Sequence, residues 1–193
     1  MLEKNVLDVL FLEARTHYKW TKKEVSADLL RRVYELAVMG PTSMNCCPMR
    51  ITFVTSKQAK EKLKATLMEG NVEKTMSAPV TAILAYDQLF YKKLPELFPH
   101  MDAMSWFEGN ESFTRETAFR NATLQSAYFM LAARSLGLDC GPMSGFNADA
   151  VDEAFFQGTT WKSNFLCNLG YGDVESLYPR GPRPSFEEAC HIS

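Results

Sequence analysis

Apolar and polar positions alternate along the chain with the periods of both helices and strands. Between residues 26 and 39, apolar residues recur at every third or fourth position, the spacing of one helix face. Short runs at 51–55 and 163–172, rich in branched and aromatic side chains, predict strands. The order expected from these patterns is helix (1–16), helix (26–39), strand (51–55), helix (56–69), strand (78–86), helix (114–136), helix (147–156) and strand (163–172).

Several of the predicted helices carry recognisable end signals. Ser26 and Asn147 directly precede helical patterns and are residue types that cap helix N-termini. Gly40 and Gly137 follow helical patterns, where glycine readily adopts the left-handed turn that ends a helix. The helix expected at 56–69 has a lysine-rich face, which we expect to be solvated.

The run "APVTAILAY" at 78–86 is almost entirely apolar, which predicts a strand buried on both faces. By contrast, "LDCGPMSGF" at 138–146 is read as a loop, because glycine and proline interrupt it. Helices and strands intermixed over 193 residues predict one α+β domain, residues 1–193, with a mixed sheet flanked by helices.

Residues 87–113 follow neither period. They hold six aromatic residues among prolines and a glycine, which indicates short helices rather than one long element. Two interpretations remain open: an inserted segment whose aromatic residues cover a site, or an irregular satellite of the core.

The loop "GPTSMNCCPMR", Gly40 to Arg50, carries more polar hydrogen-bonding groups than a connector needs.

The tail "DVESLYPRGPRPSFEEACHIS", residues 173–193, has prolines and no helix or strand period. Such a tail is stable only against another surface, for example that of a partner subunit.

The amino-acid composition limits the class of protein. Apolar content of 46%, charged content of 23% and a net charge of −2 are those of a globular domain without broad attraction to nucleic acid or anionic membrane. No apolar run reaches the roughly 20 residues that span a bilayer, and the start lacks the pattern of a signal peptide, so a cytoplasmic protein is expected. Five cysteines without a C-x-x-C pair, and three histidines far apart, predict free thiols and no metal site.

Motifs for simple hydrolases, nucleotide triphosphatases and Rossmann domains are absent from the sequence. Instead, a set of short runs, in this order and spacing, resembles the FMN-dependent nitroreductase family over nearly the whole chain. The runs are "GPTSMNC", "GN" followed by Lys74, "APVTAI", "FYKKLPELFPH", "SWF", "ETAFRN", "LGLDCGPMSGF", "KSN", "GYGD" and "SFEEA".

The resemblance implies an intertwined homodimer with FMN at the subunit interface. The guanidinium group of arginine can donate two hydrogen bonds to the FMN phosphate, and a side-chain amide can offer a donor and an acceptor to the edge of the flavin ring. The positions matched to the phosphate are Arg15, Thr16, His17, Arg180 and Arg183, where either of the last two could make the contact. The positions matched to the ring are Lys19, Asn71, Lys74, Pro142, Met143, Ser144 and Gly145, and from the other subunit Pro41, Thr42, Ser43 and Asn45.

Within that family, the runs are most similar to members that reduce malonic semialdehyde to 3-hydroxypropionate in bacterial pyrimidine degradation. The resemblance implies ping-pong transfer of hydride from NADPH or NADH through flavin N5. No general acid is identified. Candidates to bind the substrate carboxylate are Arg50, His100, Arg115 and Arg120, and Phe98, Trp106 and Phe107 are expected to form a lid within 87–113. The alternatives are a general nitro or quinone reductase and a non-catalytic flavin-binding protein.

Overall fold

The computed structural model describes residues 4–193. Its centre is one sheet of β1 (Met49–Val54), β2 (Val80–Asp87), β3 (Asp139–Met143) and β4 (Trp161–Gly170), in the order β1-β2-β4-β3. All neighbouring strands pair antiparallel. The predicted α+β class is therefore confirmed. The predicted mixed sheet is wrong, because the four strands are all antiparallel and the parallel pairing found within residues 4–193 is an isolated bridge between Thr16 and Cys140.

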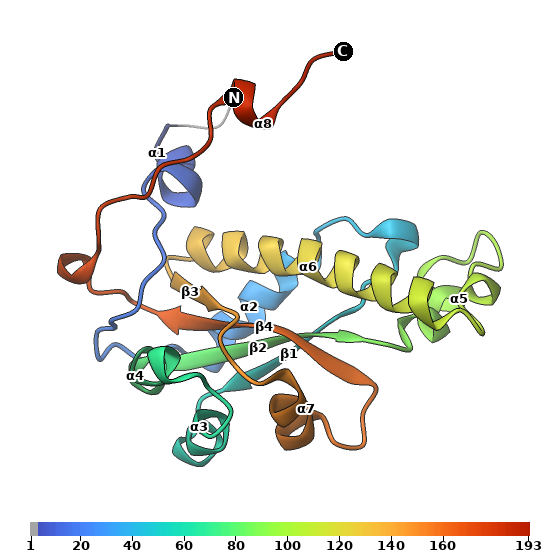
Figure 1. Ribbon diagram of the computed structural model, residues 1–193, viewed down its shortest axis with the longest axis horizontal. Helices are drawn as coiled ribbons and strands as arrows, with labels where there is room; N and C mark the ends of the chain where they lie inside the picture. The colour runs from blue at the N-terminus through green and yellow to red at the C-terminus, as the bar shows by residue number, and fades with distance from the viewer. Residues whose placement is uncertain (1–3) are drawn as a thin grey trace.

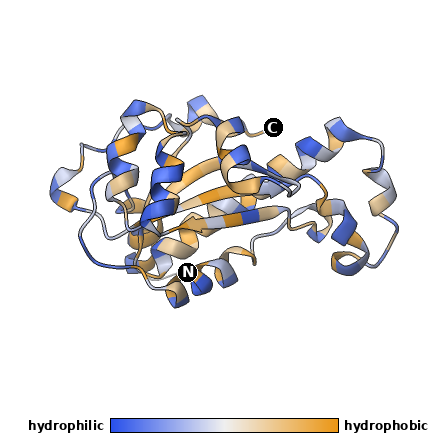
Figure 2. Ribbon diagram, turned by 90° about the horizontal axis from the view of Figure 1, so that it is seen from below, coloured by the Kyte–Doolittle hydropathy of each residue, from blue (hydrophilic) through white to orange (hydrophobic). Residues whose placement is uncertain are grey.

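Helices cover both faces of this sheet (Figure 1). α2 (Ala27–Ala37) and α6 (Glu111–Ser135) lie on one face, and α3 (Lys57–Lys64), α4 (Glu69–Ser77) and α7 (Ala148–Phe156) lie on the other. In Figure 2 the strands are mostly orange and lie between helices with blue outer surfaces.

Strand β2 is buried on both sides, as its apolar sequence predicts. Leu84 packs in the core beneath α2 and α6, whereas Ile83 packs with the apolar side chains of α3 and α7. Because successive strand residues point to opposite faces, an unbroken apolar run supplies both cores.

The helix signals predicted at Ser26, Asn147 and Gly137 are present, but the left-handed turn expected at Gly40 is not. Gly40 lies beyond the end of α2, which stops at Ala37 with Val38 as its cap, and the positive-φ glycines of residues 4–193 are Gly109, Gly137 and Gly158. The Ser26 hydroxyl accepts a hydrogen bond from the Leu29 amide, and the Asn147 side chain caps α7 in the same way. Gly137 follows α6 with φ 80°, a backbone angle that glycine adopts without a steric penalty.

Three regions differ from the sequence prediction. The helix expected at 1–16 ends at Leu12 as a short α-helix followed by a π-helix, and its first three residues lie outside the described part of the chain. The helix expected at 56–69 ends at Lys64, where the Thr66 hydroxyl bonds the Leu63 carbonyl, and a separate helix, α4, begins at Glu69. The loop expected at 138–146 contains strand β3. Pro142 is tolerated there because β3 lies at the edge of the sheet, beside β4.

Residues 87–113 form a lobe of short helices, namely the 3₁₀ helices η3 (Phe90–Lys93) and η4 (Met104–Trp106) and the helix α5 (Leu94–Leu97). Phe107 packs at the centre of the lobe, with its ring centroid 5.0 Å from that of Phe90 and 5.1 Å from that of Phe113. The lobe extends beyond the sheet, at the right of Figure 1.

The described parts of the two terminal segments lie side by side. The N-terminal segment holds α1 (Lys4–Leu7) and a π-helix, η1 (Asp8–Leu12), and the C-terminal segment holds η5 (Val174–Ser176) and α8 (Phe186–Ala189). Both project away from the body in Figure 1, and both expose large apolar side chains such as Phe11 and Ile192. None of the helices within residues 4–193 combines the length and apolarity that crossing a bilayer demands.

Candidate functional site

A pocket of about 310 Å³ lies where the N-terminal segment, α4 and β3 meet, and we call it the lysine pocket. The residues that line it include two lysines, Lys19 and Lys74, and one acidic residue, Glu73, so the lining favours an anionic ligand. The pocket is lined by Thr16, His17, Tyr18, Lys19, Gly70, Glu73, Lys74, Gly141, Pro142 and Tyr178.

The wall of the lysine pocket depends on glycine. The backbone N–H of His17 donates to the Cys140 carbonyl at 3.0 Å and holds the N-terminal segment against β3. A Cβ at Gly141 would lie 2.4 Å from the His17 carbonyl oxygen, so only glycine allows the two backbones to approach this closely.

The loop after β3 is tied to α4 by a side-chain amide. Asn71 is buried, and its Nδ2 donates to the Gly145 carbonyl at 2.7 Å. The same carbonyl accepts from the Met68 amide at 3.1 Å. The Asn71 Oδ1 makes no hydrogen bond within residues 4–193, and Asn71 directly follows Gly70, which lines the pocket. Met143 is buried, whereas Ser144 is exposed.

The three arginines matched to the phosphate occupy different settings. Arg15 donates to the Tyr178 carbonyl, and Arg180 donates to the carbonyls of Leu12 and Ala14, so both brace the N-terminal segment against the C-terminal one. Arg183 is exposed and donates to the carbonyls of Gly181 and Pro182 in its own turn.

The His17 side chain turns away from the solvent and is 4% exposed. Its Nε2 lies 3.4 Å from the Asp139 carboxylate, and its Nδ1 lies against Gly172 without a hydrogen bond to residues 4–193. Burial lowers the pKa of His17 below 6.5, and the Asp139 carboxylate opposes this shift without overcoming it.

The Gly40–Arg50 loop lines a second depression, of about 400 Å³, which we call the α6 groove. The loop contains a 3₁₀ turn, η2 (Ser43–Asn45), and the Asn121 side chain of α6 accepts from the Ser43 amide at 2.8 Å. The Asn45 side chain donates to the Leu97 carbonyl and thereby joins the loop to the 87–113 lobe. The groove is lined by Pro41, Thr42, Ser43, Met44, Phe113, Thr117, Arg120, Asn121 and Leu124.

The backbone of this loop is unusual. Met44, Asn45 and Cys47 all have positive φ, between 39° and 51°, although none is glycine. Such conformations persist where the surroundings impose them, and the Thr42 hydroxyl does so here by accepting from the Cys47 amide at 3.2 Å. Burial raises the pKa of Cys46 to about 12, so this thiol stays protonated.

The candidate substrate anchors differ in how far their charges are already paired. Arg50 pairs with Asp87 at 2.8 Å and also donates to two backbone carbonyls, which makes it part of the loop's framework. Arg120 lines the α6 groove and pairs with Glu116 on its own helix. His100 and Trp106 lie in the 87–113 lobe and are exposed.

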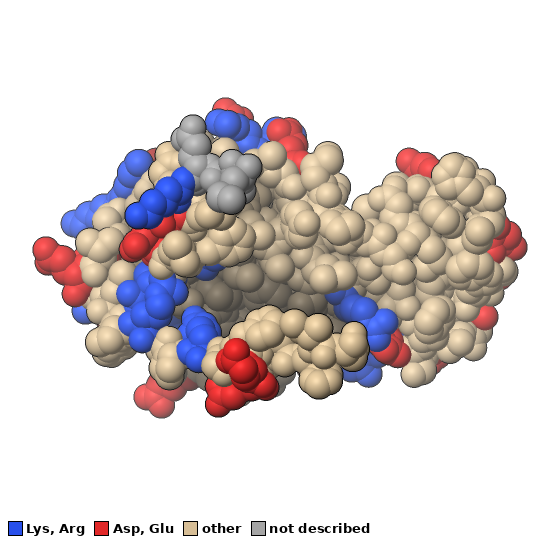
Figure 3. Space-filling model, turned by 90° about the horizontal axis from the view of Figure 1, so that it is seen from above, with Lys and Arg blue, Asp and Glu red and all other residues tan. Residues whose placement is uncertain are grey.

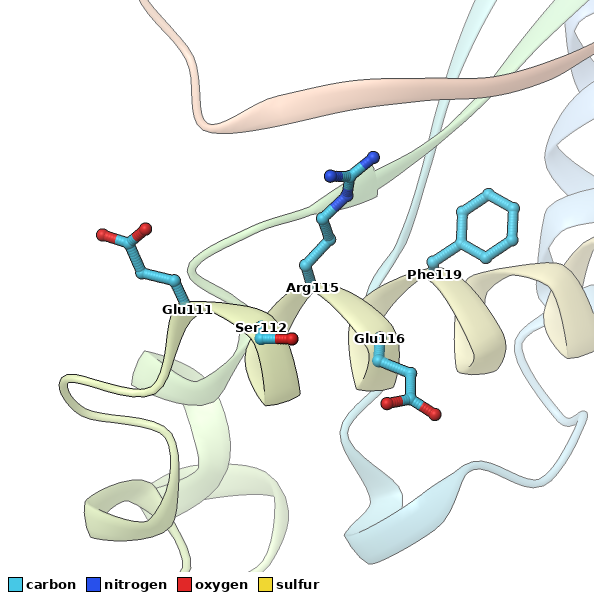
Figure 4. A pocket seen from close by; sticks show the side chains of 5 residues that line it. All are labelled: Glu111, Ser112, Arg115, Glu116 and Phe119. Atoms are coloured by element: carbon cyan, nitrogen blue, oxygen red, sulfur yellow. The ribbon is translucent and has the colours of Figure 1, made fainter.

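Arg115 lies in a further cavity, of about 570 Å³, on a different side of α6. Its guanidinium extends into this cavity beside Phe119, whereas Glu116 points the other way (Figure 4). Neither a hydrogen bond nor an ion pair joins Arg115 to another residue of 4–193. The cavity is lined by Glu111, Ser112, Arg115, Glu116 and Phe119.

The lysine pocket and the α6 groove lie at different ends of one chain. In Figure 1, α4 lies below the sheet, and the 41–45 turn lies above α6 beside the 87–113 lobe. The α6-bearing face is hollowed between the terminal segments and this lobe, with Lys and Arg side chains at the margins (Figure 3). One chain therefore does not bring all predicted cofactor residues together.

Comparison with known proteins identifies the architecture. A model of the nitroreductase family matches residues 12–171, which include β1 to β4 and most of the lysine pocket. The chain belongs to the nitroreductase family. A nitroreductase relative from Polynucleobacter asymbioticus, described as a "putative NADH dehydrogenase/NAD(P)H nitroreductase", is 56% identical over 192 residues, covering 100% of this chain and 98% of its own.

Solved nitroreductase structures share the fold. A Bacillus subtilis structure described as a nitroreductase aligns with a TM-score of 0.90 and 25% identity, over 99% of this chain and 100% of its own. A nitroreductase from Exiguobacterium sibiricum, solved in complex with FMN, aligns with a TM-score of 0.86 and 19% identity, over 100% of this chain and 99% of its own.

Sequence reasoning missed some residues of the lysine pocket. Tyr18 and Tyr178 stack with ring centroids 5.3 Å apart and join the two terminal segments beside the pocket. The position of Tyr178, two residues before Arg180, was the available signal. The sequence patterns assign residues 70–77 to no helix, so they do not reveal that Gly70 and Glu73 lie on α4 and line the pocket together with Lys74.

Proposed function

We propose that this nitroreductase is an FMN-dependent NAD(P)H oxidoreductase that reduces malonic semialdehyde to 3-hydroxypropionate. The observation that carries the proposal is the lysine pocket, which collects Thr16, Lys19, Lys74 and Pro142 from three separate segments. When bound, FMN would accept hydride from NAD(P)H and donate it to the aldehyde carbon in a second half-reaction.

The residues of the pocket fit an anionic flavin. Lys19 and Lys74 supply positive charge, which favours both the phosphate and a ring that gains negative charge on reduction. Asn71 offers a free amide oxygen to a donor on the ring edge. The relative from Exiguobacterium sibiricum, a protein of the same fold, was solved with FMN.

The complete site requires a homodimer in this proposal. The α6 groove of one chain, with Pro41, Thr42, Ser43 and the neighbouring Asn45, would face the lysine pocket of its partner, and the 87–113 lobe would cover it. Large apolar side chains on α2 and α6 support an interface, since such patches mark association surfaces. Those at least 40% exposed include Tyr34, Leu36, Phe113, Phe119, Leu124 and Tyr128.

Within that assembly, Arg120 is the favoured anchor for the substrate carboxylate. It lines the groove beside Thr42 and Ser43, and its ion pair with Glu116 is exposed to solvent. The donors of Arg50 are instead occupied by the less exposed Asp87 and by backbone carbonyls. Arg120→Gln should raise the KM for malonic semialdehyde at least tenfold more than that for a neutral aldehyde of equal length, since a charged hydrogen bond contributes about 1.5–3 kcal/mol. Arg115→Gln, on the same helix, is the matched control. Equal effects on both aldehydes would exclude Arg120 as the anchor.

The decisive experiment is anaerobic reduction of the FMN-loaded protein by NADPH or NADH, followed by a panel of oxidants. Loss of the yellow colour and its return with malonic semialdehyde supports the proposal. Return only with quinones or nitroaromatics supports a general nitroreductase, which the family assignment and the name of the Polynucleobacter relative fit equally well. A protein that holds FMN but is never reduced would be a non-catalytic flavin binder.

A further inference from the structure

Lys60 is a buried lysine for which the proposed reaction has no use. It lies on α3 and is 5% exposed, although the sequence pattern predicts a solvated lysine face there. Lys57, on the same helix, is exposed. Burying an ammonium group costs free energy unless its donors are well matched, so the residue needs an explanation.

The ammonium group of Lys60 has two neutral partners. Its Nζ donates to the Thr75 carbonyl at 2.8 Å and to the Thr81 hydroxyl at 2.7 Å. No acidic side chain of residues 4–193 forms an ion pair with it. Desolvation alone lowers the pKa of Lys60 to about 8. A carboxylate partner would oppose that shift, so the cation is held only by hydrogen bonds.

These bonds fix the direction of a longer network. Because the Thr81 oxygen accepts from Lys60, its own proton goes to the Asn168 Oδ1 at 2.6 Å. The Asn168 amide is thereby oriented with its Nδ2 toward the Lys74 carbonyl, to which it donates at 3.1 Å. The Trp20 indole donates to the same carbonyl at 3.1 Å.

The network therefore ends on the backbone of a residue that lines the lysine pocket. The carbonyls of Lys74 and Thr75 lie in the last turn of α4, where a helix leaves its carbonyls without internal partners. Cations are favoured at this end of a helix. The Thr75 hydroxyl also donates to the Met143 sulfur at 3.5 Å and so reaches β3.

We propose that Lys60 is a positioning residue for the lysine pocket. Its ammonium group, acting through Thr81 and Asn168, holds the last turn of α4 against β2 and β4 so that the Lys74 side chain stays in the pocket. A merely structural role would be served by an apolar side chain of similar length, which avoids the cost of burying a charge. The proposal rests on the proposed function only in taking FMN as the ligand.

The experiment is a double-mutant cycle between Lys60 and Lys74, read out as the Kd of FMN by titration of flavin fluorescence. Lys60→Met should raise the Kd about tenfold, the loss expected when a charged hydrogen bond that orients a ligand contact is removed. In a Lys74→Met background, the same change should raise the Kd less than about twofold, since the group that it positions is gone. Lys57→Met is the matched control and should leave the Kd unchanged.

Thr81→Val supplies a second, milder variant. It removes one hydroxyl and breaks both the bond from Lys60 and the bond to Asn168, so it should give the same coupling to Lys74 even if Lys60→Met does not fold. Circular dichroism of the FMN-free variants identifies the folded ones. The proposal is overturned if folded variants bind FMN like the wild type, or if their effects multiply with that of Lys74→Met. Failure of the wild-type protein itself to bind FMN would instead overturn the proposed function.

Discussion

The Asn71 amide and the Gly145 carbonyl form a 2.7 Å hydrogen bond, and Asn71 directly follows Gly70, which lines the lysine pocket. The contact joins the first turn of α4 to the loop after β3, two segments separated by 74 residues in the chain. There is no room for a side chain at this contact, because a Cβ on Gly145 would lie 2.4 Å from the Asn71 Nδ2.

Gly145→Ala should weaken FMN binding about tenfold or more, because the added methyl group displaces Asn71 and breaks its hydrogen bond. Titration of the FMN-free protein with the cofactor measures this. Gly70→Ala is the matched control, since Gly70 lines the same pocket but a Cβ there has no neighbour within 4 Å. A Gly145→Ala protein with wild-type affinity would show that the loop adapts without involving Asn71.

Gly172→Ala should destabilise the fold by at least about 2 kcal/mol, the scale of overpacking a buried site. A Cβ at this position would lie 1.9 Å from the buried His17 Nδ1. Removing the imidazole should restore the space, so His17→Ala combined with Gly172→Ala should be more stable than the sum of the single effects. Urea denaturation of the four proteins measures the coupling, and strict additivity would contradict it.

Acidification should destabilise the protein partly through His17. Its folded-state pKa lies below the ordinary value of 6.5, so the unfolded chain binds the proton more readily. The contribution of His17 to stability is therefore complete above pH 6.5 and is lost as the pH falls below that value. Between about pH 7.5 and about pH 5.5, the wild type should lose more free energy of unfolding than His17→Gln. Equal losses would indicate that the imidazole is solvated.

Lys60 should produce a pH dependence of the same sign as His17, but in the alkaline range, where the free energy of unfolding again rises with pH. Its pKa is about 8 in the folded chain and 10.5 in an ordinary setting, so the unfolded state binds more protons between these values. The stabilising contribution of this site should rise by up to about 3 kcal/mol across that interval. Chemical denaturation at several pH values would reveal the rise in the wild type and its absence in Lys60→Met. The same slope in both proteins would show that the lysine is hydrated.

Much of the fold follows from the sequence. Ser26, Asn147 and Gly137 mark helix ends through local hydrogen bonds and backbone angles, and such signals depend on no distant residue. Strand β3 was not predicted from the sequence, because glycine and proline, here Gly141 and Pro142, are uncommon within strands. Only the tertiary structure reveals that Pro142 lies on an edge strand and that Gly141 admits another backbone.

The candidate site was predictable only in part. Thr16, Lys19, Lys74 and Pro142 were matched by resemblance, and the fold places them in one pocket. The burial of Lys60 was not predictable, because Lys60 is one of several lysines on the same helix and its hydrogen-bond partners lie 15 and 21 residues away. No local sequence pattern predicts that the lysine pocket and the α6 groove lie apart, since their separation depends on where distant segments of the chain lie on the sheet.

The left-handed backbone of Met44, Asn45 and Cys47 has a consequence for binding kinetics. A loop held in this shape by Thr42, Asn121 and the Leu97 carbonyl has already lost its conformational entropy during folding. A molecule that docks on it meets a preorganised surface and does not have to order it. Association at this loop should therefore resemble rigid docking, with an on-rate limited by orientation rather than by a conformational step.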